Sequence, residues 1–328
     1  MKMNPAVMKH CTAILRIILI ALLLQSVAFN GYTAPGKPRG GKHYLKIKSP
    51  DDLKAMFRYT GDSVCFISSH RGGPENHLCE NSIATFENTL DHTYSMMEID
   101  PHWTKDSILV VMHDPTLQRT SNGKGRISDF TLKELQELRL KDVKGNVTDY
   151  KIHTLKEVLK WAKGRTILVM DKKEVSMKDR VRAVEEAGAE AYTIIMAYTF
   201  DEAKICYSMN KDIMMQVFIP TPEKMKEFDQ TGVPWSNVVA FVSHQMPADT
   251  RIFDMIHQKG ALCILGTSRN LDLEVIKGQV PDIHQLEKSY NDLYRKGVDI
   301  LETDIPVEVS KVVAGRMSSP TYTSKFLK

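Results

Sequence analysis

The segment VCFISSHRGGPENHLCENSIATFENTLDHTYSMMEID, residues 64–100, contains the pattern that decides the fold. Two apolar runs, Val64–Ser69 and Met96–Asp100, each end in or run directly into charged side chains. Packing gives a core strand no reason to end in charge, whereas an active site built at the carboxyl ends of strands does. The segment therefore predicts buried strands whose ends carry a functional site.

The same alternation of apolar run and helical gap recurs along the rest of the chain. Most runs lack polar alternation, which is typical of strands buried on both faces. Helix-starting signals lie between them, such as Thr154 with Glu157, and Thr221 before Pro222. Eight such units predict an α/β fold, a (β/α)8 TIM barrel in one domain. The alternative is an open doubly wound sheet, but no G-x-G-x-x-G follows the first run. The predicted strands are Val64–Ser69, Met96–Asp100, Thr166–Asp171, Ala191–Met196, Ile213–Phe218, Val238–Ser243, Ala261–Leu265 and Asp299–Glu302.

Residues 115–152 do not follow this repeat. They are polar, and they contain one short helix signal, in which Thr131 and Glu134 are spaced to form a capping box. An additional apolar run, Ile108–Met112, leads into them. We interpret the segment as a small insertion after the second strand, on the active-site face.

Both ends of the chain lie outside the predicted barrel, which spans residues 61–316. Residues 1–34 have a basic start, an apolar run over Ile17–Leu24 and then small residues, which is typical of a signal peptide and its cleavage region. The run is too short to span a membrane comfortably, although a retained anchor is the alternative. Residues 35–60 are interpreted as a lead-in and residues 317–328 as a C-terminal tail. We therefore expect an exported protein, periplasmic or extracellular if the source is bacterial.

The charge balance excludes one class of partner. Cleavage after Ala28 would remove Lys2, Lys9 and Arg16, so that 41 basic residues would face 40 acidic ones. A mature chain this close to neutral lacks the basic surface that nucleic-acid binding requires. We expect a small-molecule substrate, no nucleic acid and no stable membrane span in the mature chain.

Three carboxylates stand at the ends of neighbouring apolar runs. Glu98 and Asp100 are two residues apart on one strand, so their side chains point to the same face, and Asp171 ends the next main run. Carboxylate oxygens without a nearby thiolate suit a hard divalent ion, Ca²⁺ or Mg²⁺, better than zinc. The alternative is a solvated strand end with ordinary salt bridges. Convergence of acids and histidines from several strands favours the metal site.

Two histidines and two cations accompany these acids. His70 and His113 each follow an apolar run, which favours a general acid and a general base over two structural histidines. Arg71 and Lys173 either neutralise the carboxylates or hold a phosphate. The combination indicates metal-assisted displacement at an anionic centre, with phosphorus favoured.

In these motifs the chain resembles the glycerophosphodiester phosphodiesterase family. Several motifs, in order and well separated between residues 64 and 313, carry the resemblance. They are His70-Arg71-Gly72, Glu80-Asn81-Ser82, Glu98-Ile99-Asp100, His113-Asp114 with Arg119-Thr120, Asp171-Lys172-Lys173, Gly297-Val298-Asp299 and Thr303-Asp304-Ile305-Pro306.

The resemblance implies a TIM barrel with a small insertion and the release of sn-glycerol 3-phosphate and an alcohol from a glycerophosphodiester. It also implies a role for each candidate residue. Glu98, Asp100 and Asp171 would bind the divalent ion, His70 and His113 would be the acid–base pair, Arg71 and Lys173 would contact the phosphate, and Glu80 would bind the metal or orient the groups around it.

The sequence departs from the family pattern at two places. Asp171 replaces the usual glutamate and is one methylene shorter, and the usual Trp-Thr segment after the seventh strand is replaced by Leu265-Gly266-Thr267-Ser268. Two alternatives stay open at this stage. One is a phospholipase D-like enzyme that cleaves lipid phosphodiesters on the same barrel, and the other is a non-catalytic barrel that binds phosphodiesters.

Overall fold

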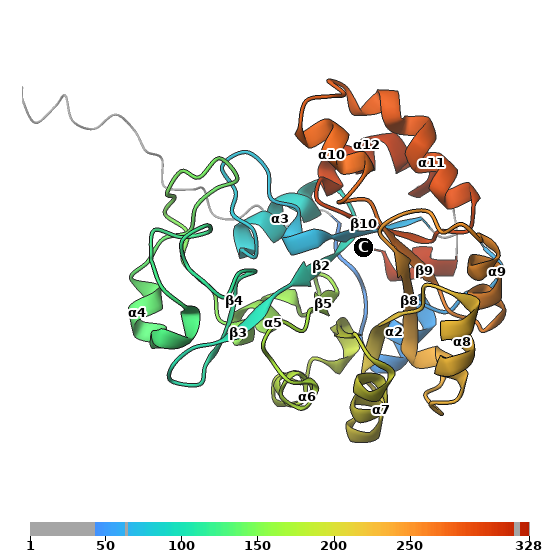
Figure 1. Ribbon diagram of the computed structural model, residues 1–328, viewed down its shortest axis with the longest axis horizontal. Helices are drawn as coiled ribbons and strands as arrows, with labels where there is room; N and C mark the ends of the chain where they lie inside the picture. The colour runs from blue at the N-terminus through green and yellow to red at the C-terminus, as the bar shows by residue number, and fades with distance from the viewer. Residues whose placement is uncertain (1–42, 63–64, 318–321, 328) are drawn as a thin grey trace, which may run out of the picture. The chain divides into compact units, whose positions relative to one another are not determined.

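Eight parallel strands close into a barrel, with helices packed around its outside (Figure 1). The computed structural model describes residues 43–62, 65–317 and 322–327. The strand order around the barrel is β1-β10-β9-β8-β7-β6-β5-β2. The predicted (β/α)8 barrel is therefore confirmed. Its strands are β1 (Phe66–Ser69), β2 (Ser95–Ile99), β5 (Leu168–Met170), β6 (Thr193–Ala197), β7 (Met214–Phe218), β8 (Val238–Ser243), β9 (Cys263–Gly266) and β10 (Ile300–Thr303).

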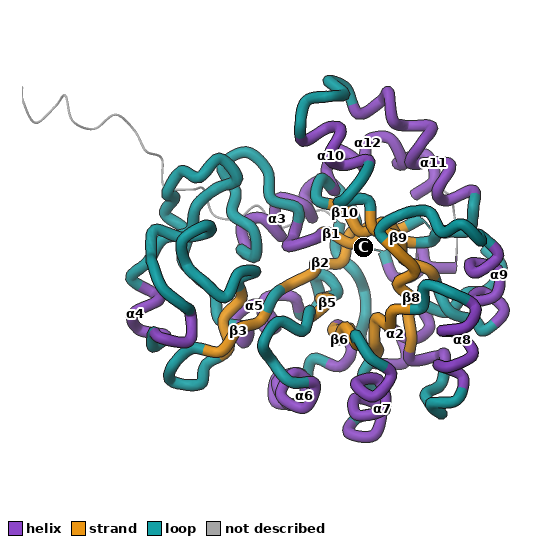
Figure 2. Tube along the Cα trace, in the orientation of Figure 1, coloured by secondary structure: helices purple, strands orange, loops and turns teal. Residues whose placement is uncertain are grey.

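Each strand lies within a residue or two of the run that predicted it. Nearly every strand residue is buried, because one face of the sheet looks into the barrel and the other packs beneath the helices. Figure 2 shows this arrangement as a ring of strands with helices outside it. The carboxyl ends of all eight strands consequently open on one face, where loops carry the polar residues.

The helices begin where the sequence offers caps. Thr154 and Glu157 form a reciprocal capping box at α5, Thr131 and Glu134 form another at α4, and the Thr221 side chain caps α8. The described helices are α2 (Pro50–Met56), α3 (Ile83–His92), α4 (Leu132–Gln136), α5 (Leu155–Ala162), α6 (Met177–Ala187), α7 (Phe200–Met209), α8 (Pro222–Asp229), α9 (Arg251–Gln258), α10 (Leu271–Ile276), α11 (Glu287–Arg295) and α12 (Pro306–Met317).

The segment after β2 forms a small lobe beside the barrel, drawn in green at the left of Figure 1. It starts with a hairpin in which β3 (Pro101–Trp103) pairs antiparallel with β4 (Leu109–Val111), which is the additional predicted run. A separate apolar cluster, including Leu117, Leu135 and Ile152, fills it. Strand β3 was not predicted, because a strand of three residues is too short to show a period.

The lead-in closes the amino-terminal end of the barrel. Leu45, Leu53 and Phe57 are buried in the cluster that fills the barrel interior, and Leu45 pairs with Leu327 from the C-terminal tail. The predicted signal peptide lies outside the described residues. Among the described residues, no helix has both the length and the apolar character that crossing a membrane requires.

Candidate active site

One cavity of about 320 Å³ opens at the carboxyl ends of the strands. Six residues singled out in the sequence line it, although they come from four separate segments of the chain. They are His70, Arg71, Glu98, His113, Asp171 and Lys173. Asp100 lies beside Glu98 and Asp171, whereas Glu80 is not part of the lining. The residues predicted at the carboxyl ends of the strands therefore lie close together in the folded chain.

The three carboxylates form a compact acidic cluster. Glu98, Asp100 and Asp171 are buried, and each offers an oxygen that lies within 4.8 Å of the other two. Burial, together with the charges of Asp100 and Asp171, raises the pKa of Glu98 well above its ordinary value. A buried triad of negative oxygens is stabilised by a multiply charged cation, so the donor set fits a hard divalent ion.

Neighbouring donors hold the aspartates of this cluster in place. Lys173 Nζ lies 2.9 Å from Asp100 Oδ1 and 2.7 Å from Asp171 Oδ2. Burial of Asp100 raises its pKa, but the Lys173 ammonium, His113 and the hydrogen bond from Asn81 together outweigh burial, and the pKa falls to about 2. Asn81 Nδ2 donates to Asp100 Oδ2 at 2.6 Å, and the Tyr198 hydroxyl donates to Asp171 Oδ1 at 2.5 Å. Both aspartates are thereby held as oriented acceptors.

Each candidate histidine is oriented by an aspartate. His70 Nδ1 lies 2.5 Å from Asp304 Oδ1, and His113 Nδ1 lies 2.7 Å from Asp114 Oδ1. Burial lowers the pKa of His70, but the hydrogen bond to Asp304 and nearby carboxylates outweigh burial, so its pKa is raised. Burial also lowers the pKa of His113, and there the neighbouring acids do not compensate. The pKa values of the two imidazoles are therefore shifted in opposite directions from the ordinary value for histidine.

Glu80 orients cations. Its carboxylate accepts two hydrogen bonds from Arg119, at 2.7 and 2.8 Å, and one from Arg71 Nη1 at 3.3 Å.

Arg71 and Lys173 both have positive φ angles, 52° and 39°, which non-glycine residues rarely adopt. Such strain is concentrated at functional sites, where the surrounding structure enforces it.

Another side of the cavity, which adjoins the acidic cluster at Tyr198, was not predicted. There Tyr198, Phe218, Phe241 and His244 form a chain of ring contacts, with centroids 4.7 to 4.9 Å apart. The signal was present, since each of these residues ends a strand or lies within three residues of its end. Sequence alone does not reveal this side of the cavity, because an aromatic residue near a strand end packs in a core as readily as it lines a cavity. We call this side, formed by β6 to β9, the aromatic wall.

Polar groups accompany the aromatic wall. Gln216, Arg269 and Glu302 also line the cavity, and burial raises the pKa of Glu302 to about 7. Burial, together with Arg269, lowers the pKa of His244 to about 4, so its imidazole is neutral. The cavity therefore has an acidic side that is rich in charge and an aromatic wall that is nearly neutral.

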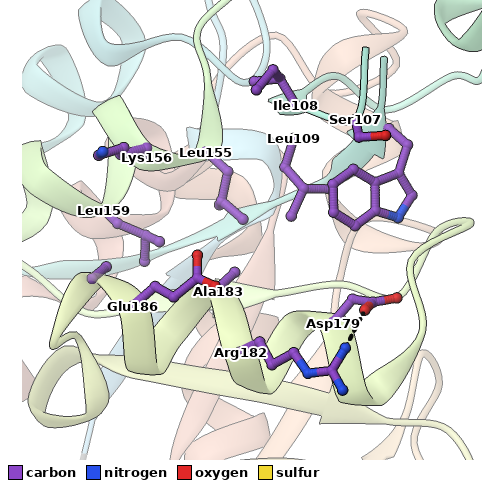
Figure 3. Close-up of a pocket in the computed structure, with 12 residues that line it drawn as sticks. Ser107, Ile108, Leu109, Leu155, Lys156, Leu159, Asp179, Arg182, Ala183 and Glu186 are labelled. Atoms are coloured by element: carbon purple, nitrogen blue, oxygen red, sulfur yellow. Dashed lines mark hydrogen bonds and ion pairs between the residues drawn. The ribbon is translucent and has the colours of Figure 1, made fainter. Parts of the chain in front are cut away.

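A larger hollow lies elsewhere, outside the barrel. Figure 3 shows this groove of about 420 Å³ between the β3–β4 hairpin and helices α5 and α6. Its lining is mainly apolar, with Leu109, Leu155 and Leu159, and its arginine, Arg182, is paired with Asp179. Volume alone would favour this groove, but it holds no convergent acid, base and cation set, so we assign the chemistry to the barrel mouth.

Comparison with known proteins agrees with this assignment. The model of the glycerophosphoryl diester phosphodiesterase family matches residues 70–304, an interval that begins and ends at the paired residues His70 and Asp304. The chain belongs to this family. The predicted enzyme class, a phosphoric diester hydrolase, is thereby confirmed.

Individual family members resemble this one to different degrees. A glycerophosphodiester phosphodiesterase from Caldanaerobacter subterraneus is 32% identical over 173 residues, which cover 52% of this chain and 69% of the relative. The crystal structure of a glycerophosphoryl diester phosphodiesterase from Parabacteroides distasonis is 38% identical, with a TM-score of 0.83, over 88% of this chain and 99% of that one. An Oleispira antarctica phosphodiesterase, solved with its product sn-glycerol-3-phosphate, is 19% identical with a TM-score of 0.59, over 76% of this chain and 97% of that one, and supports the fold alone.

Proposed function

We propose that this protein hydrolyses glycerophosphodiesters to sn-glycerol 3-phosphate and an alcohol at the acidic side of the barrel mouth. One observation carries the proposal. Three buried carboxylates, two aspartate-oriented histidines and two strained cations converge on one cavity in a chain of this family. A binding barrel has no need of such a set, because holding an anion requires cations alone.

Glu98, Asp100 and Asp171 would hold a divalent cation, Ca²⁺ or Mg²⁺. When bound, such an ion supplies Lewis-acid stabilisation of the charge that grows on the phosphoryl oxygens. The shorter Asp171 still reaches the cluster, with both of its oxygens engaged by Tyr198 and Lys173. Its replacement of a glutamate is therefore compatible with a site for the ion.

Arg71 and Lys173 would contact the phosphate. The Nε of Arg71 is buried and has no hydrogen-bond partner among the described residues, so it is available to an oxygen of the substrate. Lys173 bridges two carboxylates and reaches into the same cavity. Positive groups held rigidly at this point stabilise the transition state without the cost of reorganising them during the reaction.

The opposite pKa shifts suggest separate roles for the two histidines. His113, whose pKa is lowered, is unprotonated near neutral pH and would take the proton from the attacking hydroxyl. His70, whose pKa is raised, retains its proton to higher pH than an ordinary histidine and would deliver it to the leaving alkoxide as the phosphorus–oxygen bond breaks. Glu80 would orient Arg71 from behind.

We also propose that the protein is exported, on the strength of the basic and apolar pattern in residues 1–34. The mass of the protein recovered from outside the cytoplasm tests this. A chain shortened to a start near Phe29 is expected, and full-length protein held in the cytoplasm would contradict the proposal.

The reaction is tested by measuring glycerol phosphate released from glycerophosphocholine and glycerophosphoethanolamine, with and without added Ca²⁺ or Mg²⁺. We expect release that a chelator stops and one of the ions restores. Asp171→Asn should be inactive, and adding the ion should not restore its activity. The exposed control Asp201→Asn should keep both its activity and its dependence on the ion. Full activity after exhaustive chelation would contradict the metal site. No release with either ion would favour lipid phosphodiesters or a binding role.

A further inference from the structure

A buried amide on the aromatic wall has no partner in the fold. Gln216, on β7, is fully buried, yet neither Oε1 nor Nε2 makes a hydrogen bond to any described residue. Its side chain lines the active-site cavity. A buried amide that is left unsatisfied is costly, and a ligand with hydroxyl groups satisfies both its donor and its acceptor.

The position of Gln216 places it beside the acidic cluster. It pairs in register with Met196, one residue after Ile195, and Ile195 pairs with Met170, one residue before Asp171. Gln216 and Asp171 therefore occupy the same level of the barrel, two strands apart. A ligand held by the acidic cluster meets the Gln216 amide if it extends along the barrel mouth towards β7.

A second feature of this wall depends on a missing side chain. The His244 ring lies directly over Gly266, where a Cβ would come within 2.3 Å of Nδ1. Asn270 ties the two loops together, since its Nδ2 donates to the carbonyl oxygen of His244. Because Gly266 has no side chain, the His244 imidazole occupies the space that a Cβ would fill.

The charges on this side are of both signs. Arg269 is exposed at the rim and close enough to lower the pKa of His244, and the carboxyl groups of Glu302 and Asp304 line the same cavity. A quaternary ammonium group would be attracted by the rings of Phe218 and Phe241, but it has no polar hydrogen or lone pair with which to satisfy the Gln216 amide. A neutral polyol stacks its carbon framework on the rings and directs its hydroxyls to the amide, the imidazole and the guanidinium.

We propose that the aromatic wall, through Gln216, His244 and Arg269, is a binding site for a polyhydroxylated leaving alcohol such as inositol or glycerol. The proposal rests on the proposed function and specifies its substrate class. Arg269 is the exposed member of this set, and it also lines the cavity.

The test compares kcat/KM on four substrates, with glycerophosphoinositol and glycerophosphoglycerol as polyol diesters and glycerophosphocholine and glycerophosphoethanolamine as cationic ones. Wild type should prefer the polyol diesters. Gln216→Leu preserves the side-chain volume. It should lower kcat/KM at least tenfold on glycerophosphoinositol but little on glycerophosphocholine. A tenfold loss lies within the range expected when the hydrogen bonds of one buried side chain are removed. Gln230→Leu, on an exposed helix end, is the matched control and should change neither.

A uniform loss on all four substrates would overturn the proposal, because Gln216 would then hold the glycerol or the phosphate that they share. Calorimetric binding of free inositol and choline separates this result from a failure of the proposed reaction. If wild type hydrolyses none of the four substrates, the proposed reaction is contradicted. In that case the proposed binding site is supported only if wild type binds inositol in preference to choline and Gln216→Leu does not. Equal binding of the two alcohols would overturn it.

Discussion

Strand β10 has a histidine–carboxylate pair at each of its ends. Asp304, just after the strand, lies 2.5 Å from His70, and Asp299, just before it, lies 2.8 Å from His257. Each pair borders a cavity of about 320 Å³. Neither the residue types nor the volume distinguishes the two ends of the barrel.

The difference lies in what the neighbouring groups leave unsatisfied. At the amino-terminal end, Asp299 Oδ2 accepts from both His257 and the Cys263 backbone amide, and Tyr59 stacks on the imidazole at 3.8 Å. His257, Cys263 and Asp299 are close enough to hold an ion, but the His257 ring and the Cys263 backbone amide already bond to Asp299. At the carboxyl end, Arg71 Nε and the Gln216 amide have no hydrogen-bond partner among the described residues. Unsatisfied groups that line one cavity, together with strained backbone, therefore mark the active site, whereas the pair at the amino-terminal end has its partners within the fold.

The largest effect is expected from a residue at the carboxyl end. His113→Ala should lower kcat by about 100- to 10,000-fold, since it removes a positioned general base. Its thermal midpoint should stay close to that of wild type, because the imidazole is partly exposed and holds no other element in place. Activity is measured as glycerol phosphate release by the purified variant. Undiminished turnover would remove His113 from the chemistry.

The opposite result is expected at the amino-terminal end. His257→Ala removes the side-chain partner of the buried Asp299 carboxyl and should lower the free energy of unfolding by roughly 1–3 kcal/mol. Its kcat, measured where it is folded, should match wild type. The control is His284→Ala, which breaks an exposed pair with Glu287 and should cost about 1 kcal/mol or less in a urea titration. A loss no greater than that of the control would mean that the His257–Asp299 pair does not stabilise the fold.

Much of this contrast was visible in the sequence. The eight strands were predictable because buried parallel strands are continuous apolar runs, and the acidic side because its residues follow those runs in family order. The aromatic wall was not, because Phe218 and Phe241 have the same residue type as core residues and only the closed barrel turns them into a cavity. The satisfied state of Asp299 was equally hidden, since its partners His257 and Cys263 are 42 and 36 residues away.

The pH dependence separates the two pairs. The reaction needs His113 unprotonated and His70 protonated, so kcat/KM should fall as pH drops through the lowered pKa of His113 and as pH rises through the raised pKa of His70. Asp304→Asn removes a carboxylate that raises the pKa of His70, so the alkaline limb should move to lower pH. The acid limb should stay in place. In Asp299→Asn, at the other end, neither limb should move, and a shift there would break the contrast.

The smallest effects are expected at two glycines, one at each end. A Cβ on Gly266 would displace His244, whereas a Cβ on Gly297 would come within 2.9 Å of Phe253 Cβ at a backbone φ of +98°. Gly297→Ala should therefore lower stability by roughly 1–3 kcal/mol, through strain and overpacking, and leave kcat/KM unchanged. Gly266→Ala has no positive φ to strain, and its clash is with a ring that borders open space. It should cost less stability but lower kcat/KM severalfold on glycerophosphoinositol. Equal stability losses with unchanged selectivity would mean that His244 only fills space, and that the two ends differ less than their hydrogen bonds indicate.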